Sequence, residues 1–537
     1  MCGIGRGSAA FIPWQAYGGF HMPGPLSSLK ALKKTIAARK WFRNARLVYH
    51  GLGPIGADMF RHFMPVRTII ALYYGDEVAR HIEPEWGARV FSHEKENRVR
   101  MTDGSDFYLN YLRDRGGEIA AHVESLGGKP CLAPFAPSAP IHEFIYNYAP
   151  HWRLLTHAKI MQDFFEFKAR LAQEAGKIGI PMPPESIVLP FSKLDYRKLS
   201  DRFDGGFVIQ TPLSQAGRGT EFVFSEEDYA RVIGEKRRLM GHSFAVTSAK
   251  ITPFLDGPCP NCTGCVVNGT VAVSQPDIQV CGDPYFVQLP GQYIGSDYTV
   301  DAFSPGQVRL MHDVVRRIGR WLGENGYRGN FGVDFLSTVD RDNRVKDICV
   351  SEVNARMVGE SQYLADFQAR EDCVPLTFFH LAEWFDIREI TRREIEEYNR
   401  ALPPIRGSAL TLYTRGKGTF TPKGGVTSGV YRVEGGRLAR QRDGCLLSQV
   451  RSDEEFVLSV GVPWKGLVIG HPARGDRNVS LCYILTRDSI VDPRNYRVVS
   501  EKWRGIADLV TQSIGLSPCP PRRLLSERGG RPGARRP

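Results

Sequence analysis

Two acidic residues and an asparagine occupy matched positions around a short turn. Asp334 and Glu352 are equally far from Asn343, and the alternation of apolar residues predicts two strands, 332–339 and 345–354, that form a hairpin. The two carboxylates should then lie opposite each other, and Asn354 should share their face. Mg²⁺ prefers oxygen ligands and usually combines one or two carboxylates with substrate phosphates. The sequence therefore predicts that Asp334, Glu352 and Asn354 hold one or two Mg²⁺ ions.

Arg356 continues the same alternation beyond this set. A guanidinium beside metal-bound phosphates can neutralise charge that develops during group transfer. A hairpin with merely solvated charges is the simpler alternative. However, Asp334 stands between Val333 and Phe335, and carboxylates among core residues are costly without a partner. The pattern therefore favours metal binding.

A small flexible loop at 214–220 is the second candidate for chemistry. Gly217 and Gly219 permit a close approach of the backbone to a phosphate, and Arg218 offers a positive charge. Lys159, early in a predicted helix, offers another. Such a loop is weak evidence by itself, but its position directly after a predicted buried strand is suited to phosphate binding.

A competing signal lies near the N-terminus. A strand at 46–50 leads into Gly51-Leu-Gly53-Pro-Ile-Gly56, and a helix and a second strand follow, with Asp76 at the end of that strand. This order matches the dinucleotide-binding fingerprint, although amide groups at a helix N-terminus suit any anion. Two interpretations stay open: an NAD(P)-dependent oxidoreductase, or a βαβ unit whose glycines only serve packing.

Three of the eleven cysteines are closely spaced, in Cys259-Pro-Asn-Cys262-Thr-Gly-Cys265. This spacing could begin a zinc or iron–sulfur site. A fourth ligand at a suitable distance is missing, so a turn that enters a strand is the favoured interpretation.

The chain has 537 residues, which predicts two to four domains. Its net charge of +12 comes from the two ends, before Asp58 and after Cys519. Without a basic face on a folded domain we expect no nucleic-acid partner. No apolar run is long enough to span a bilayer and no secretory signal is visible, so we expect a cytoplasmic protein without a membrane partner.

Helical and strand patterns organise the chain around these residues. A helix is predicted over 156–176 with Gly176 as its C-cap, and another over 305–325, where apolar residues recur every three or four positions. From about residue 402, short alternating strands dominate and predict a separate β-rich domain. A final helix is expected to end near Ile514.

In this order, the motifs resemble the ATP-grasp superfamily. The resemblance covers about residues 150–390 and rests on Lys159, 209–220, 252–257, Gly329-Asn-Phe-Gly-Val-Asp334 and Glu352-Val-Asn-Ala-Arg356. Within that superfamily the chain, including 291–297, is similar to the peptide ligases related to pheganomycin biosynthesis.

The resemblance implies an α/β and α+β multidomain protein. The implied parts are a loosely ordered basic N-terminus (1–40), a Rossmann-like pre-ATP-grasp domain (41–150), an ATP-grasp domain (151–395), a small β-rich C-terminal domain (396–516) and a disordered Arg/Pro tail (517–537).

The resemblance also implies roles for individual residues. Lys159 would contact the phosphates of ATP, Gly217, Gly219 and Thr220 would close over them, Thr252, Phe254 and Leu255 would form a hinge beside adenine, and Arg218 and Arg356 would act in catalysis, Arg356 by orienting an acyl phosphate. Gln210 stands where many relatives carry a lysine. Glutamine can donate a hydrogen bond but brings no charge, so Arg218 or Lys250 would supply it.

The function implied by the resemblance is ligation of a carboxylate to an amine. ATP would activate the carboxylate as an acyl phosphate, and the amine of an amino acid or peptide would capture it, with release of ADP and phosphate, in the biosynthesis of a specialised peptide metabolite. A homodimer is compatible with this function. The alternatives are the oxidoreductase based on 51–56 and a degenerate ATP-grasp domain that only binds, which Gln210 supports and the intact oxygen-ligand set opposes.

Overall fold

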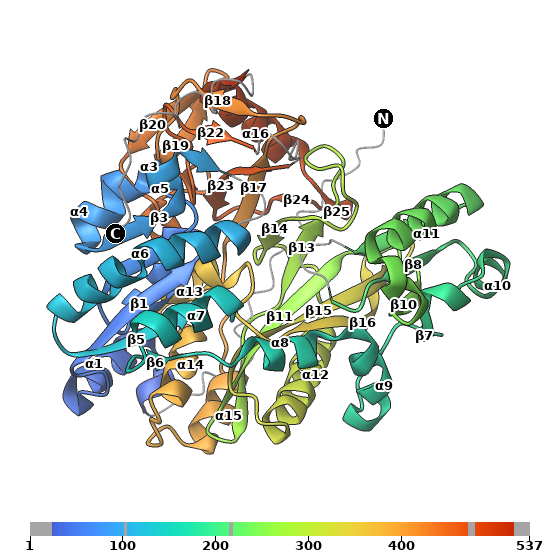
Figure 1. Cartoon of the computed structure of the whole chain (residues 1–537), viewed down its shortest axis with the longest axis horizontal. Helices are drawn as coiled ribbons and strands as arrows, with labels where there is room; N and C mark the ends of the chain where they lie inside the picture. The colour runs from blue at the N-terminus through green and yellow to red at the C-terminus, as the bar shows by residue number, and fades with distance from the viewer. Residues whose placement is uncertain (1–23, 101–104, 214–218, 471–477, 520–537) are drawn as a thin grey trace, which may run out of the picture.

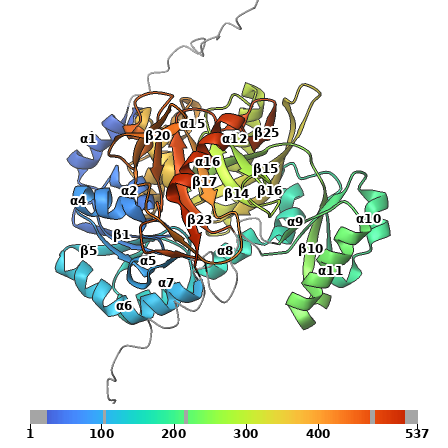
Figure 2. The same ribbon diagram turned by 90° about the horizontal axis from the view of Figure 1, so that it is seen from above.

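The described residues form three larger sheets that matter for the site, two smaller sheets, and the helices that cover them. The computed structural model describes residues 24–100, 105–213, 219–470 and 478–519, with the side chains of 105–108 excepted. Figure 1 shows an N-terminal α/β unit on one side, a long sheet through the middle and a small lobe on the other side. The small lobe also projects from the rest of the molecule in Figure 2.

The N-terminal unit is built on a parallel sheet with the order β3-β2-β1-β5-β6. Its strands are β1 (Ala45–Gly51), β2 (Val66–Ala71), β3 (Arg89–Ser92), β5 (Lys129–Pro134) and β6 (Arg153–Leu154). Its helices are α1 (Leu29–Arg39), α2 (Asp58–Arg61), α3 (Gly75–Glu77), α4 (Glu83–Trp86), α5 (His93–Asn97), α6 (Ser105–Ser125) and α7 (Ala139–Tyr148). The predicted alternation of strands and helices is therefore confirmed in this region.

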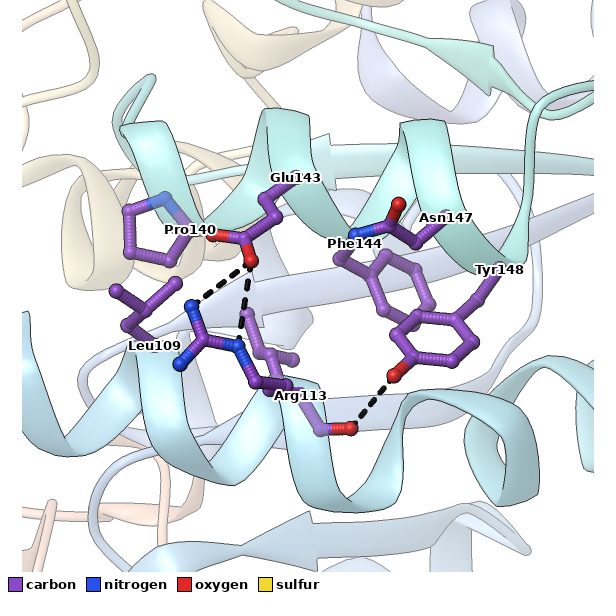
Figure 3. A pocket seen from close by; sticks show the side chains of 8 residues that line it. Leu109, Arg113, Pro140, Glu143, Phe144, Asn147 and Tyr148 are labelled. Carbon is purple, nitrogen blue, oxygen red and sulfur yellow. Dashed lines mark hydrogen bonds and ion pairs between the residues drawn. The ribbon is translucent and has the colours of Figure 1, made fainter.

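Helices α6 and α7 pack side by side on this unit. Arg113 and Glu143 form an ion pair of 2.9 Å, and the Tyr148 hydroxyl donates to the carbonyl of Arg113 at 2.7 Å. These contacts frame a small pocket between the two helices (Figure 3). The pocket lies on the outer helices of the parallel sheet, away from the predicted hairpin.

The glycines of 51–56 fit tightly against Tyr49. A Cβ atom added at Gly51 or at Gly56 would lie 2.1 or 2.2 Å from the Tyr49 hydroxyl oxygen. Asp76, the acid of the fingerprint, accepts hydrogen bonds from the Ser428 amide at 2.8 Å and from its hydroxyl at 2.9 Å. Both observations favour packing over dinucleotide binding as the role of this motif.

The small lobe is a four-stranded antiparallel sheet with the order β7-β10-β8-β9. Its elements are β7 (Ile187–Pro190), α10 (Tyr196–Arg202), β8 (Phe207–Gln210), β9 (Thr220–Val223), α11 (Glu226–Met240) and β10 (Ser248–Pro253). The lobe has its own apolar core, which includes Phe207, Ile209 and Ile251.

The central sheet has eleven strands, in the order β16-β15-β11-β13-β14-β17-β23-β21-β19-β20, with β12 paired to β11. Its strands are β11 (Cys259–Val267), β12 (Thr270–Val273), β13 (Asp277–Cys281), β14 (Tyr293–Asp297), β15 (Gly329–Val339), β16 (Val345–Asn354), β17 (Ser408–Tyr413), β19 (Gly429–Glu434), β20 (Arg437–Arg442), β21 (Phe456–Ser459) and β23 (Ser480–Thr486). Because β17 pairs with β14, the expected boundary near residue 396 does not coincide with the end of a sheet.

The remaining elements are helices and two smaller sheets, with the orders β26-β18-β22-β4 and β24-β25. They are α12 (Pro305–Glu324), α13 (Ser361–Arg370), α14 (Thr377–Trp384), α15 (Arg392–Arg400) and α16 (Glu501–Ile514), and the short strands β4 (Val99–Arg100), β18 (Phe420–Pro422), β22 (Val468–Ile469), β24 (Val491–Asp492), β25 (Asn495–Val499) and β26 (Leu516–Pro518). In the part of the chain that the structure describes, no helix has the length and apolarity needed to cross a membrane.

Several details differ from the sequence predictions. The helix expected over 156–176 is two helices, α8 (Lys159–Glu166) and α9 (Lys168–Ile178), because Phe167 has an extended backbone between them. The end is at Gly179, whose φ of +73° makes it the left-handed cap, and not at Gly176. The loose order expected for 1–40 is wrong for α1, which Ser28 caps and which buries Leu29 and Leu32.

Two further predictions were also wrong in detail. Cys259, Cys262 and Cys265 lie within β11 and not in a turn before a strand, and all three are free thiols. Alternation along β11 did not reveal the strand, because eight of its nine residues are buried. The start of the tail expected to be disordered, Ser517 and Pro518, forms β26 with β18.

Helix α12 matches its predicted span closely and supports a stability prediction. Ser304 accepts a hydrogen bond from the Gln307 amide, and the Gln307 side chain accepts one from the Ser304 amide. Replacing Ser304 by alanine removes this capping box, so Ser304→Ala should lower the free energy of unfolding by about 1 kcal/mol. Urea unfolding monitored by circular dichroism measures the change. Ser500 provides the control, because it precedes α16 without a side-chain cap, and an equal loss in Ser500→Ala would contradict the prediction.

Candidate functional site

The hairpin of β15 and β16 brings the predicted oxygen ligands together. Asp334 pairs directly with Glu352 in the register of the two strands, as the sequence predicted. The Asn354 side-chain amide donates to Asp334 Oδ2 at 2.8 Å. Two residues that the sequence did not single out also bind Asp334, since Asn261 donates to Oδ1 at 2.6 Å and Gln279 donates to the same oxygen at 3.3 Å. Four strands therefore fix the position of one carboxylate.

The pKa values of Asp334 and Glu352 are shifted in opposite directions. Burial, followed by the charge of Glu352, raises the pKa of Asp334 to about 7, although the hydrogen bonds from Asn261 and Asn354 lower it. Burial also acts to raise the pKa of Glu352, but Lys168 outweighs it and the net shift is downward. A cation between the two carboxylates would relieve their repulsion.

Among the described residues, no three His, Cys, Asp or Glu side chains are grouped so that they could hold a metal ion by themselves. The two carboxylates and the Asn354 amide fit Mg²⁺ nonetheless, because Mg²⁺ is commonly bound by one or two carboxylates together with the phosphates of a substrate. The donors present therefore suit a metal ion that arrives with a nucleotide.

Lys168 is the basic residue that the sequence analysis missed. Its ammonium group forms an ion pair of 2.8 Å with Glu352, and its side chain is only 4% exposed. Lys159, the predicted phosphate contact, is 38% exposed and pairs with Asp163 on its own helix. The break at Phe167 starts α9 at Lys168, and a prediction of one continuous helix hid this position.

Lys250 lies next to Gln210 on the small sheet. Thr220, Gln210 and Lys250 form one row across β9, β8 and β10, and the Gln210 amide lies 3.4 Å from the Thr220 hydroxyl. Lys250 donates to the carbonyl of Ser351 on β16 at 2.7 Å. It therefore connects the small sheet to the strand that carries Glu352.

The charge on Lys250 is buried close to Glu352 and Lys168. The side chain is buried, and burial lowers the pKa of Lys250 to about 8, against an opposing effect of Glu352.

Of the predicted loop residues, Gly217 and Arg218 lie outside the described residues. Gly219 has a φ of +78°, and its carbonyl accepts a hydrogen bond from the Thr211 amide at 2.9 Å.

The predicted hinge follows β10. Thr252 is buried in that strand, and the Phe254 amide donates to the carbonyl of Gly206 at 3.0 Å. The Phe254 ring packs edge-on against Phe222 and Phe224, at centroid distances of 5.9 and 5.0 Å. Leu255 comes next and is half-buried. The segment therefore offers an aromatic wall at the edge of the small sheet.

Arg356 is fixed just beyond the end of β16. Its guanidinium donates to the Asn354 side-chain oxygen at 2.8 Å and to the carbonyl of Met357 at 3.1 Å. It also forms an ion pair with Glu166 at 3.3 Å. Asn354 thus bonds Asp334 through its nitrogen and Arg356 through its oxygen, so one amide sets the spacing between a carboxylate and a guanidinium.

Comparison with solved structures shows which fold carries these residues. No protein-family model matches the chain, and no curated protein sequence matches it. The biotin carboxylase domain of the Hydrogenobacter thermophilus 2-oxoglutarate carboxylase, in complex with MgADP, ADP and bicarbonate, matches with a TM-score of 0.52 and 12% identity, over 83% of this chain and 86% of that one. Biotin carboxylase from Campylobacter jejuni in a β-γ-ATP complex gives a TM-score of 0.51 and 11% identity, over 83% and 87%.

Biotin carboxylases are ATP-grasp enzymes. The chain has the ATP-grasp fold. At this level of identity the likeness concerns the fold alone. Within the ATP-grasp fold of this chain, the candidate residues come from two sheets, with Gln210, Thr220 and Lys250 on the small one and Asp334, Glu352 and Asn354 on the central one. Lys250 and Lys168 lie where the two sheets meet, because one contacts Ser351 and the other contacts Glu352.

Proposed function

We propose that this chain is an ATP- and Mg²⁺-dependent ligase that joins a carboxylate to an amine. The observation that carries the proposal is the meeting of Asp334, Glu352 and Asn354 with two buried lysines, Lys168 and Lys250, between the sheets of an ATP-grasp fold. The MgADP named for the Hydrogenobacter structure supports the nucleotide and the metal.

The proposed reaction has two balanced steps. A carboxylate oxygen of the substrate attacks the γ-phosphorus of ATP, and ADP leaves. The nitrogen of the amine then attacks the acyl carbon, the carbon–oxygen bond to phosphate breaks, and the amine loses a proton as the amide forms. Bound Mg²⁺ would neutralise phosphate charge. The contribution of the protein is mainly position and electrostatic stabilisation.

Each residue has a part in this scheme. Asp334, Glu352 and Asn354 would hold the metal, and Lys168 and Lys250 would face the phosphates. Arg356, held by Asn354 and Glu166, would orient the acyl phosphate. The remaining predicted contacts stay part of the proposal: Lys159, Gln210, Gly217, Arg218, Gly219 and Thr220 for the phosphates, and Thr252, Phe254 and Leu255 for adenine.

The finer assignment rests on the resemblance to the pheganomycin-type peptide ligases. We propose an amino acid or peptide as the amine, a role in the biosynthesis of a specialised peptide metabolite, and a cytoplasmic enzyme that forms a homodimer. The domain limits 41–150, 151–395 and 396–516 belong to the same proposal.

The direct test is phosphate release from ATP in the presence of Mg²⁺, across a panel of amino acids and short peptides, with mass spectrometry of the products. The proposal predicts ADP, phosphate and an amide in equal amounts for at least one pair of substrates. Hydrolysis of ATP that no carboxylate stimulates, together with no condensed product, would refute it.

The pH dependence of the reaction should reveal Lys250. Below its pKa of about 8 the side chain carries the positive charge proposed to face phosphate, and above this value it loses the charge. We therefore expect kcat/KM for ATP to fall as the pH rises through about 8, since kcat/KM reports the free enzyme. Lys250→Met should be slower and should lack this break. Lys198→Met, at an exposed site on α10, should keep it, and a Lys250→Met profile with the same break would contradict the assignment.

A further inference from the structure

A row of polar side chains extends from the proposed metal site across the central sheet. In the registers of the paired strands, Glu352 faces Asp334, Asp334 faces Asn261, and Asn261 faces Asp277. Paired residues on neighbouring strands point to the same face of a sheet, and strands lie about 4.8 Å apart. Asp277 is therefore about 10 Å from Asp334 on the same face, two strands further toward the C-terminal part of the sheet.

Asp277 and its neighbour Glu360 are buried acids that the described residues satisfy only in part. Their exposed fractions are 0% and 1%. Within the described residues, neither carboxyl oxygen of Asp277 has a hydrogen-bond partner of normal geometry. The same holds for Oε1 of Glu360. The Ser296 hydroxyl is close enough to lower the pKa of Asp277 against the effect of burial, and it also contacts the Tyr293 hydroxyl at 2.9 Å, where either group can donate.

Asn261 adds an independent sign of a ligand. Its side chain is 0% exposed, and its nitrogen is used by Asp334. Its oxygen, Oδ1, has no hydrogen-bond partner among the residues that the structure describes. An amide oxygen and two carboxyl groups thus lie together next to the reaction site, with the Ser296 hydroxyl near Asp277 and the charge of Arg356 near Glu360.

Other buried acids of this region are fully engaged. Asp297, on the next strand, accepts hydrogen bonds from the amides of Thr299, Val300, Ile490 and Val491 and from the Ser489 hydroxyl. Asp283 accepts from two amides and pairs with Arg504. The fold satisfies buried carboxylates where they serve structure. Asp277 and Glu360 are not satisfied in this way: burial raises the pKa of Asp277 well above its usual range and raises the pKa of Glu360 to about 8, so each carboxyl group is neutral unless a cation lies beside it.

The surroundings suit an organic cation. Tyr298 and Tyr363 are buried next to the two acids, and Glu360 and Asp277 both raise the pKa of each tyrosine after burial. Carboxylates and aromatic rings together bind ammonium and guanidinium groups well, through charge and through the faces of the rings.

We propose that Asp277 and Glu360, with Asn261, form a subsite for a positively charged group on the acceptor amine. The acceptor would then be an amine that carries a second cationic group, such as a basic amino acid or a diamine. This inference rests on the proposed ligase function and adds the substrate class. The reacting nitrogen would lie near Asp334 and Arg356, and the second charge would lie two strands away.

The test compares charged acceptors with neutral ones of similar shape by calorimetry, in the presence of Mg²⁺ and a non-hydrolysable ATP analogue. The pairs are L-arginine with L-citrulline, L-lysine with L-norleucine, and 1,4-diaminobutane with butylamine. The wild-type protein should bind at least one charged member about 10-fold more tightly, which corresponds to about 1.4 kcal/mol. Asp277→Asn should reduce this ratio to about 2-fold or less.

Two further variants complete the design. Glu360→Gln tests the same subsite if Asp277→Asn does not fold, and the exposed Asp301→Asn should keep the wild-type ratio. The inference is overturned if no charged member binds more tightly than its neutral partner, if the ratio survives in both subsite variants, or if these variants lose a bound Mg²⁺ and keep the ratio.

The same compounds, assayed for ADP release together with the carboxylates of the panel, separate this inference from the proposed function. Charge-dependent binding without ADP release from any acceptor refutes the ligase and retains the subsite. ADP release that is equal for charged and neutral acceptors retains the ligase and refutes the subsite.

Discussion

Glu352→Gln should lower the rate of substrate-dependent ADP release by about 10³-fold. Loss of one electrostatic stabiliser typically costs 10²- to 10³-fold, and this change has a second effect. It removes a charge from the proposed metal site and also leaves Lys168, which is 4% exposed, without its anionic partner. The measurement is kcat for ADP release at saturating Mg²⁺, with the substrates found in the panel.

Asp347→Asn is the matched control for this variant. Asp347 lies on the same strand, and its side chain is 69% exposed at the far end of the hairpin. The control should keep a rate within about 2-fold of the wild-type protein, as surface changes usually do. Near-normal ADP release in Glu352→Gln would contradict the assignment of Glu352 as a metal ligand.

Lys168→Met should lower kcat/KM for ATP by about 10²-fold, mainly through a higher KM. The buried ammonium group is proposed to face phosphate between the two sheets, where the low dielectric makes its charge effective. Methionine keeps most of the volume and the unbranched shape of the side chain while it removes the charge. Initial rates at varied ATP concentration measure the effect.

Variants of two other lysines serve as the control and the comparison for Lys168→Met. Lys177 is on the same helix with a side chain that is 77% exposed, and Lys177→Met should leave kcat/KM unchanged. Lys159→Met tests the lysine predicted from the sequence. Since Lys159 is half-exposed and paired with Asp163, we expect a smaller loss than for Lys168. Equal losses in Lys168→Met and Lys177→Met would remove Lys168 from the proposed site.

Local patterns were sufficient for the elements whose contacts are near in sequence. The pairing of Asp334 with Glu352 was predicted from their equal distances from Asn343, although the register shifts between Ser337 and Val339 and again between Asp334 and Phe335. Helix α12 was also predicted from local signals, because Ser304 marks its start and buried residues such as Met311 and Ile318 recur at helical spacing. The three proposed oxygen ligands came from this level of information.

Local patterns failed where an element depends on distant neighbours. Phe167 has an extended backbone within a segment whose sequence pattern is helical. Phenylalanine is not a helix-breaking residue type, so the sequence does not indicate the break. The cysteines of 259–265 drew attention to metal binding, whereas the residue of interest between them is Asn261, which reaches Asp334 from another strand. The fingerprint at 51–56 likewise needed the position of Tyr49 to be interpreted as packing.

The sequence by itself therefore determined the hairpin, the oxygen ligands, Arg356 and the resemblance to the ATP-grasp superfamily, because these depend on spacing within short segments. Only the tertiary structure brought Lys168 and Lys250 to β16, placed Asn261 against Asp334 and left Asp277 and Glu360 buried beside them. Those contacts join residues that are far apart in the chain, and their register is fixed by packing of whole sheets and helices, which no local pattern records.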